Sequence, residues 1–137
     1  MGLQLKSILV KDADDLERAF NAAKSAGMQA LTFTPSTFLV TNRQKIIDLA
    51  AKFRLPAIYP GTVYAEAGGL MSYGPDLTDN DRRAAGYVDK ILKGTKPGDL
   101  PVQQPMRFEF AINLKAAKQI DVIIPPNVLV RADKVIR

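Results

Sequence analysis

The sequence predicts a single α/β domain with a mainly parallel sheet and helices on both of its faces. Short apolar runs bounded by Gly or Pro recur along the chain, and amphipathic segments of helical period separate them. Strands separated by single helices indicate parallel pairing, because antiparallel neighbours need only a tight turn. The 137 residues, of which 47% are apolar, suffice for one domain with a substantial core.

Each expected element follows from its apolar period and from the residues at its ends. Asp12 is the expected N-cap of the first helix, Thr41 with Gln44 predicts a capping box, and Asn113 caps the helix after the last strand. The expected strands are 3–10, 30–34, 57–59, 70–73 and 107–112. The expected helices are 12–26, 41–53, 63–67, 78–94, 113–119 and 126–136, with an extended connector at 95–105.

Composition excludes several classes of site. The chain has no Cys and no His, which removes disulfides, thiolate metal sites and Ser-His triads, and no cofactor is expected. The net charge of +5 would suit a nucleic-acid partner, but the basic residues are scattered among acidic ones and no basic run carries interleaved aromatics. We therefore expect no nucleic-acid partner.

The chain also contains no sequence that predicts membrane insertion or export. No apolar run approaches the roughly 20 residues that a membrane span needs. The first residues lack the charged and apolar regions of a signal peptide. The chain as given is therefore expected to stay in the cytoplasm if it is expressed in this form.

Two further patterns have simple structural explanations. Asp12, Asp14 and Asp15 follow an expected strand, as in a phosphoacceptor pocket, but helix capping and the helix dipole account for them. Tyr87 and Lys90 resemble the Tyr-Lys pair of dehydrogenases, although their spacing is three and no G-x-G-x-x-G motif is present. We favour the structural explanation in both cases, and we expect no enzymatic activity.

The stretch Leu55–Pro75 (LPAIYPGTVYAEAGGLMSYGP) holds the candidate ligand site. It contains two short apolar runs that end in Pro60-Gly61 and Gly74-Pro75, where open α/β sheets bind small ligands. Tyrosines suit stacking on an organic ligand, although packing in the core explains them as well. The hydroxyls of the preceding strand end lie on the same predicted edge. The candidate residues are Thr34, Pro35, Ser36, Thr37, Phe38, Tyr59, Gly61, Tyr64, Glu66, Tyr73 and Gly74.

Several strings resemble the ABC-transporter substrate-binding family related to tryptophan-binding components. They are AGGLMSYGP, YVDKILKG, KPGDLPV and INLKAAK, and the resemblance extends over nearly the whole chain. It implies a Rossmann-like, three-layer lobe of a type I periplasmic binding protein, which clamps a ligand in the cleft between two lobes. It also implies a small-molecule ligand, an ABC permease as partner, a periplasmic location and no catalysis. Family members commonly carry a basic residue where this chain has Gly61-Thr62.

The resemblance assigns the chain to most of the second lobe. It implies one α/β domain over 1–137, with a crossover segment at 78–112, a C-terminal helical extension at 113–137 and a hinge at Gly74-Pro75. The first lobe and the opening strand-helix unit of the second lobe are absent, so a truncated protein is expected. An exposed sheet edge and exposed apolar surface would follow. We therefore expect a homodimer, with exchange of the segment after Pro75 as one way to form it.

Two functional hypotheses remain. The first is a solute-binding lobe of an ABC importer that holds a small ligand, such as an amino acid, at the strand-end loops. The second is an α/β interaction or regulatory domain that self-associates without a small ligand. A ligand-dependent melting temperature favours the first hypothesis, and dependence on protein concentration alone favours the second.

Overall fold

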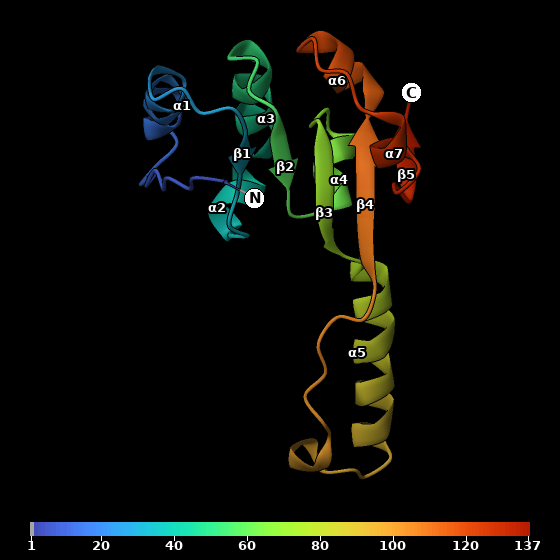
Figure 1. Cartoon of the computed structure of the whole chain (residues 1–137). Helices are drawn as coiled ribbons and strands as arrows, with labels where there is room; N and C mark the ends of the chain where they lie inside the picture. The colour runs from blue at the N-terminus through green and yellow to red at the C-terminus, as the bar shows by residue number, and fades with distance from the viewer. Residues whose placement is uncertain (1) are drawn as a thin grey trace.

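Five strands form one mixed sheet in the order β1-β2-β3-β4-β5 in the computed structural model, which describes residues 2–137 (Figure 1). Parallel pairs join β1 to β2, β2 to β3 and β4 to β5, whereas β3 and β4 are antiparallel. The strands are β1 (Leu31–Thr32), β2 (Ala57–Tyr59), β3 (Met71–Pro75), β4 (Phe108–Asn113) and β5 (Lys134–Ile136). The predicted α/β class with a mainly parallel sheet is confirmed.

Helices connect the strands and build most of the core. They are α1 (Asp15–Ser25), α2 (Thr37–Thr41), α3 (Arg43–Lys52), α4 (Thr62–Glu66), α5 (Leu77–Leu92), the 3₁₀ turn η1 (Pro97–Asp99), α6 (Leu114–Gln119) and α7 (Pro126–Leu129). The main core lies on the side of the sheet that carries Tyr59, where apolar residues of α1, α3 and α4 meet β2. Each fully buried large apolar side chain there contributes roughly 1.5–3 kcal/mol.

The opposite side of the sheet is packed less completely. Met71 follows the alternation of β3 onto this side and contacts the smaller cluster of Leu70, Ala117 and Ile120. Further along the same two strands, Tyr73 is 54% exposed and Phe108 is 46% exposed. The side that carries Tyr59 therefore holds the larger core, and α6 packs around Leu70 at one end of the sheet.

Helix α5 projects away from the sheet and forms an arm together with the returning segment, residues 77–107 (Figure 1). None of its 16 residues is buried. Asp76 caps the helix by accepting a hydrogen bond from the Asp79 amide over 3.1 Å. The chain enters and leaves the arm side by side, because Pro75 pairs with Phe108 in the antiparallel ladder.

The N-terminal strand and the terminal helix were predicted wrongly. Residues 3–10 form no strand, although Ile8 and Val10 pack partly against the core. Helix α7 ends at Leu129 and is followed by β5, because Val135 and Ile136 pair with β4 instead of continuing the helix. The period of the terminal segment fits a helix, but pairing with a strand distant in sequence decides its structure.

The predicted capping box was also wrong, whereas the cap at Asn113 is confirmed. The hydroxyl of Ser36 accepts a hydrogen bond from the Leu39 amide over 3.2 Å, so helical structure begins at α2. Gln44 instead donates to Asp48 over 2.9 Å. Asn113 accepts from the Ala116 amide over 3.0 Å and begins α6 as expected.

Candidate functional site

The carboxyl ends of β1, β2 and β3 lie at one edge of the sheet, because these three strands are parallel neighbours. The segments at this edge are 33–38 after β1, 60–62 after β2 and 74–76 at the end of β3. Open α/β sheets bind ligands outside this edge, in the crevice between the loops. The structure therefore brings together the strand ends that the sequence placed at one edge of the sheet, and this edge stays the candidate site.

Gly74 brings two of these segments into direct contact. A Cβ atom at this position would lie 2.2 Å from the carbonyl oxygen of Pro60 and 3.3 Å from the amide nitrogen of Gly61. Such a separation is far below van der Waals contact, so only glycine allows the end of β3 to lie against the turn after β2. Gly74 thus shapes the edge through its backbone.

The loop after β1 presents the most accessible candidate residues. Thr34, Pro35 and Thr37 are exposed, and Phe38 is half-buried because its ring packs partly against the core. Ser36 is exposed as well, but its hydroxyl caps α2. The loop can therefore offer two uncommitted threonines and part of an aromatic ring to a ligand.

Tyr59 and Tyr64 lie inside the core beneath this edge. Phe33, Tyr59 and Tyr64 form a stack with ring centroids 5.2 and 5.4 Å apart. Tyr59 is 2% exposed and Tyr64 is 4% exposed, so neither ring has a free face for stacking on a ligand. Burial raises the pKa of the Tyr59 phenol strongly, and the carboxylate of Asp48 adds to this effect. The two rings therefore belong to the core that packs beside this edge.

Tyr73 lies on the other side of the sheet from Tyr59. Its neighbour Ser72 pairs with Tyr59 in register, and successive side chains of a strand point to opposite faces. The Tyr73 ring stacks on Phe108 at a centroid distance of 5.5 Å, at the base of the arm. The three tyrosines that cluster in sequence therefore do not converge on one surface.

Glu66 is engaged by β5, the strand at the opposite side of the sheet from β1. Its carboxylate accepts a hydrogen bond from Lys134 of β5 over 2.6 Å, and this bond raises the pKa of Lys134. In the same region Thr62 donates to the Glu109 carboxylate over 2.8 Å. These contacts join α4 to β4 and β5. Glu66 has a partner that the sequence did not predict, because the two residues are distant along the chain.

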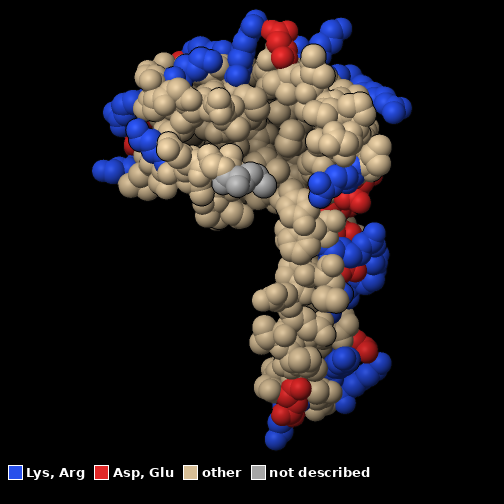
Figure 2. Space-filling model, in the orientation of Figure 1, with Lys and Arg blue, Asp and Glu red and all other residues tan. Residues whose placement is uncertain are grey.

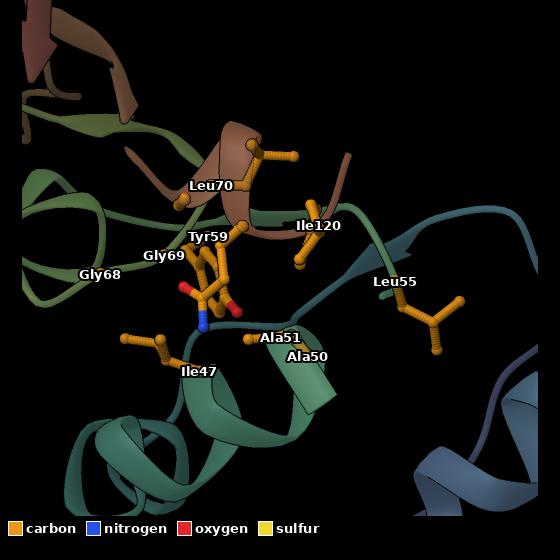
Figure 3. A pocket seen from close by; sticks show the side chains of 12 residues that line it. Ile47, Ala50, Ala51, Leu55, Tyr59, Gly68, Gly69, Leu70 and Ile120 are labelled. Atoms are coloured by element: carbon orange, nitrogen blue, oxygen red, sulfur yellow. The ribbon is translucent and has the colours of Figure 1, made fainter. Parts of the chain in front are cut away.

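A small apolar cavity lies near the Gly68-Gly69 pair, at the opposite end of β3 from the loops (Figure 3). Its volume of about 20 Å³ leaves room for one water-sized molecule. A Cβ atom at Gly69 would lie 2.7 Å from the Tyr59 ring, so the pair allows a close approach of backbone to ring. The apolar lining of this cavity suits packing rather than ligand binding.

A second hollow of about 270 Å³ lies in the arm, between α5 and the returning segment. Arg83 and Tyr87 contribute to it from the helix, and Gln103 and Gln104 contribute from the other side. The hydroxyl of Tyr87 donates to the carbonyl oxygen of Pro101 and holds the two parts together. No sequence pattern predicted this hollow, because its residues belong to separate elements.

Neither a cluster of metal-binding side chains nor a membrane-spanning helix is found within residues 2–137. No three acidic side chains gather there in a group that could hold a metal ion. Within the same residues, every helix is too short or too polar to cross a bilayer.

Comparison with known families gives a match over almost the full chain. The profile of the family described as ABC transporter substrate binding protein matches residues 1–136. A conserved domain protein from Vibrio cholerae O1 biovar El Tor strain N16961 is 28% identical to this chain, with a TM-score of 0.81. The superposition covers 90% of this chain and 42% of that protein. No curated protein sequence matches significantly.

Two more distant structures share the fold. An ABC domain from Streptococcus pneumoniae in complex with L-tryptophan is 24% identical, with a TM-score of 0.85 over 98% of this chain and 46% of that one. A substrate binding protein with adhesive properties from Clostridium difficile, in a ligand-free open structure, is 15% identical. Its TM-score is 0.65 over 93% of this chain and 42% of that one. The chain thus spans less than half the length of these proteins.

Proposed function

The chain belongs to the ABC transporter substrate binding protein family, and we propose that it acts as one lobe of a solute-binding component, without catalysis. In this proposal a small ligand is captured at the carboxyl edge of β1, β2 and β3. The observation that carries the proposal is the contact of Gly74 with Pro60, which brings two of the three strand-end segments together. Ligand capture at such an edge is typical of open α/β sheets.

The proposed ligand is an amino acid. Support comes from the tryptophan complex of the S. pneumoniae domain, whose fold this chain shares. The edge itself offers the hydroxyls of Thr34 and Thr37, part of the Phe38 ring and the backbone at Gly61. Hydroxyl and backbone groups would bind the polar end of an amino acid, while the ring would contact its side chain.

The proposed partners are those of a transport system. By family membership, the ligand would be collected in the periplasm and delivered to an ABC permease. We propose that the chain represents most of the second lobe, with Gly74-Pro75 as the hinge toward a first lobe. Because ligand sites usually bury most of the ligand between their walls, a single wall binds weakly. We therefore expect a Kd weaker than micromolar.

Thermal unfolding in the presence of L-tryptophan tests the proposal. At about tenfold Kd, binding to the native state should raise the Tm by roughly 5 °C. Gly61→Leu should abolish this shift, because a Cβ at Gly61 meets no atom within 4 Å and the larger side chain would extend over the edge. Gly98→Leu is the matched control in the arm, where the same substitution is equally unhindered.

The remaining standard amino acids should be tested in the same way. If none of them raises the Tm at millimolar concentration, the proposal of an amino-acid lobe is wrong. A shift that survives Gly61→Leu would place binding elsewhere. Micromolar or tighter binding by the isolated chain would contradict the single-wall argument.

A further inference from the structure

The start of β4 lies at the same edge of the sheet as the ends of β2 and β3. Because β3 and β4 are antiparallel, the first residues of β4 lie beside the last residues of β3, and Glu109 pairs directly with Gly74. The Glu109 side chain is on the face of the sheet that α4 covers, since its carboxylate accepts a hydrogen bond from the Thr62 hydroxyl over 2.8 Å. Glu109 therefore adds a carboxylate to the candidate edge, on a strand that the sequence did not connect with it.

The surroundings of Glu109 place its carboxylate next to the turn that follows β2. Gly74, directly opposite in the ladder, has no side chain, and a Cβ atom there would point at the Pro60 carbonyl oxygen. Thr62 begins α4, so its bond to Glu109 holds the carboxylate against the turn at 60–62. Glu109 and Thr62 are both half-buried, so neither is enclosed in the core. A ligand bound at this turn would therefore be within reach of the carboxylate.

The Glu109 carboxylate takes part in no ion pair among residues 2–137. Within that part of the chain, no Lys or Arg nitrogen lies within 4.0 Å of its oxygens. Lys134 is the cation whose pKa Glu109 affects: the hydrogen bond to Glu66 is the main cause of the raised pKa of Lys134, and Glu109 adds to it. Lys134 donates to Glu66 over 2.6 Å. Two carboxylates thus face one lysine, which leaves a negative charge at the edge without a cationic partner.

A carboxylate in this state suits an organic ammonium group. An ionised carboxylate has about four acceptor sites, and Thr62 occupies one of those of Glu109. A half-buried carboxylate has lost part of its hydration, so a cationic donor binds it favourably through charge-assisted hydrogen bonds. A Ca²⁺ ion would require about six to eight oxygen ligands, and within residues 2–137 Glu109 belongs to no group of three metal-binding side chains. An ammonium group requires only two or three acceptors.

Other charged side chains are sparse near this edge on the face that Figure 2 shows. Lys and Arg gather there along the upper margin of the sheet domain and along the outer side of the arm, whereas the inner angle between the sheet domain and the arm is mainly uncharged. The candidate edge lies at the lower margin of the sheet domain, where β2 and β3 end (Figure 1). A carboxylate at this edge therefore has few competing charges on that face.

From these observations we propose that Glu109 binds the ammonium group of the ligand, so that the site selects amino acids over analogues that lack the amino group. This inference rests on the ligand-binding edge proposed above. Thr62 positions the carboxylate, and the ammonium group takes acceptor sites that Thr62 leaves vacant. Glu66, the carboxylate that the sequence placed at this site, stays bound to Lys134. Glu109 thus determines the chemical class of the ligand.

Ligand analogues test this role on the full chain. NMR titration measures the Kd of the standard amino acid that raises the Tm most, beginning with L-tryptophan, and of the analogue without its amino group, which for tryptophan is indole-3-propionate. The analogue should bind the wild type about tenfold more weakly or worse, because it forms no charge-assisted hydrogen bond to Glu109. Its own carboxylate is also repelled by that of Glu109.

Glu109→Gln removes the charge but keeps an oxygen that accepts from Thr62, and circular dichroism verifies that the variant is folded. Its Kd for the amino acid should be about ten- to hundredfold higher than that of the wild type. Its Kd for the analogue without the amino group should stay equal or fall, because the repulsion between carboxylates is removed. Glu17→Gln is the matched control, since it removes the same charge from α1, where Glu17 pairs with Lys52. This control should change neither Kd.

The comparison of the two ligands separates recognition of the ammonium group from a structural role of Glu109. An equal loss of affinity for both ligands in Glu109→Gln would show that the residue only supports the shape of the edge. Unchanged affinity for both would show that the ammonium group binds elsewhere. Either result overturns this inference and leaves the proposed amino-acid site in place. If no amino acid binds the wild type, the proposed function is wrong, and this inference is wrong with it.

Discussion

Tyr59 is the most deeply buried aromatic side chain of the edge region, and its chemistry is that of the core. Its ring lies between Phe33 and Tyr64, and Gly69 lies directly against it. Burial disfavours the phenolate, which raises the pKa of the hydroxyl far above its usual value. This group therefore does not lower the free energy of unfolding below its pKa in the unfolded chain. The free energy of unfolding decreases as the pH rises from there toward the pKa in the folded state.

Tyr59→Phe should therefore reduce the alkaline loss of stability. In the wild type, the free energy of unfolding should decrease by about 1.4 kcal/mol per pH unit above roughly pH 10 from this group alone. The variant should lose this contribution. Urea unfolding at several pH values measures the slope, and Tyr73→Phe is the control because Tyr73 is half exposed. Equal slopes in wild type and Tyr59→Phe would contradict the assignment.

At residue level the sequence predicted which positions lie near the edge but not which of them are accessible. Thr34 and Thr37 are exposed as expected, whereas Tyr59 and Tyr64 are in the core. Tyr59 pairs with Ser72 and shares a face of the sheet with it, so the next residue, Tyr73, points to the opposite face. Register depends on the pairing of distant strands, which short-range patterns do not contain.

Among the elements, α4 and α6 are joined by one buried side chain. Asn113 is 5% exposed, accepts from the Ala116 amide at the start of α6 and donates to the Ala65 carbonyl in α4 over 2.9 Å. The side-chain amide of Asn113 therefore provides a hydrogen-bond partner for one backbone group in α4 and one in α6. The sequence identified the first of these roles, because a cap is local, but the bond to α4 spans 48 residues.

Asn113→Ala should destabilise the fold by about 1–3 kcal/mol, since it removes the cap from the Ala116 amide and one of the two donors to the Ala65 carbonyl, which keeps the Gly68 amide at 3.2 Å. Asn113→Asp retains the acceptor for Ala116 but brings a carboxylate against the Ala65 carbonyl, so it should also destabilise. Chemical denaturation measures both changes. Asn127→Ala, at an exposed position of α7, is the control and should change stability little. A neutral effect of Asn113→Ala would contradict this role.

Elements with strong periodicity were predicted well, and those that depend on a neighbour were not. The helices α1, α3 and α5 lie where their apolar period placed them. Residues 3–10 have the pattern of a strand but remain unpaired, and the last strand was mistaken for a helix. A strand is stabilised only by pairing, so its pattern alone does not establish it.

The whole molecule divides into a packed sheet domain and an arm without buried residues. The resemblance implies a crossover segment at 78–112, and in the structure these residues form most of α5, the returning chain and part of β4. The isolation of α5 could not be predicted, because an apolar stripe indicates that a helix packs but not against what.

Because β3 and β4 are adjacent antiparallel strands, the arm is an insertion between them that can be removed. Asp76 still pairs with Arg107 beyond the ladder, through a hydrogen bond of 3.0 Å, so the two boundaries of the insertion are adjacent. Replacing residues 77–106 with Asn-Gly should convert the junction into an ordinary β-hairpin. The shortened chain should fold cooperatively, with stability within about 1 kcal/mol of the wild type, because α5 contributes nothing to the core.

Urea unfolding of this shortened chain measures the prediction, and loss of cooperative unfolding would show that the arm is needed for folding. The same junction would accept a foreign domain in place of the arm, since insertions are tolerated where chain ends lie close together at the surface. The sheet and the arm can therefore be exchanged independently, by recombination in the laboratory or during evolution.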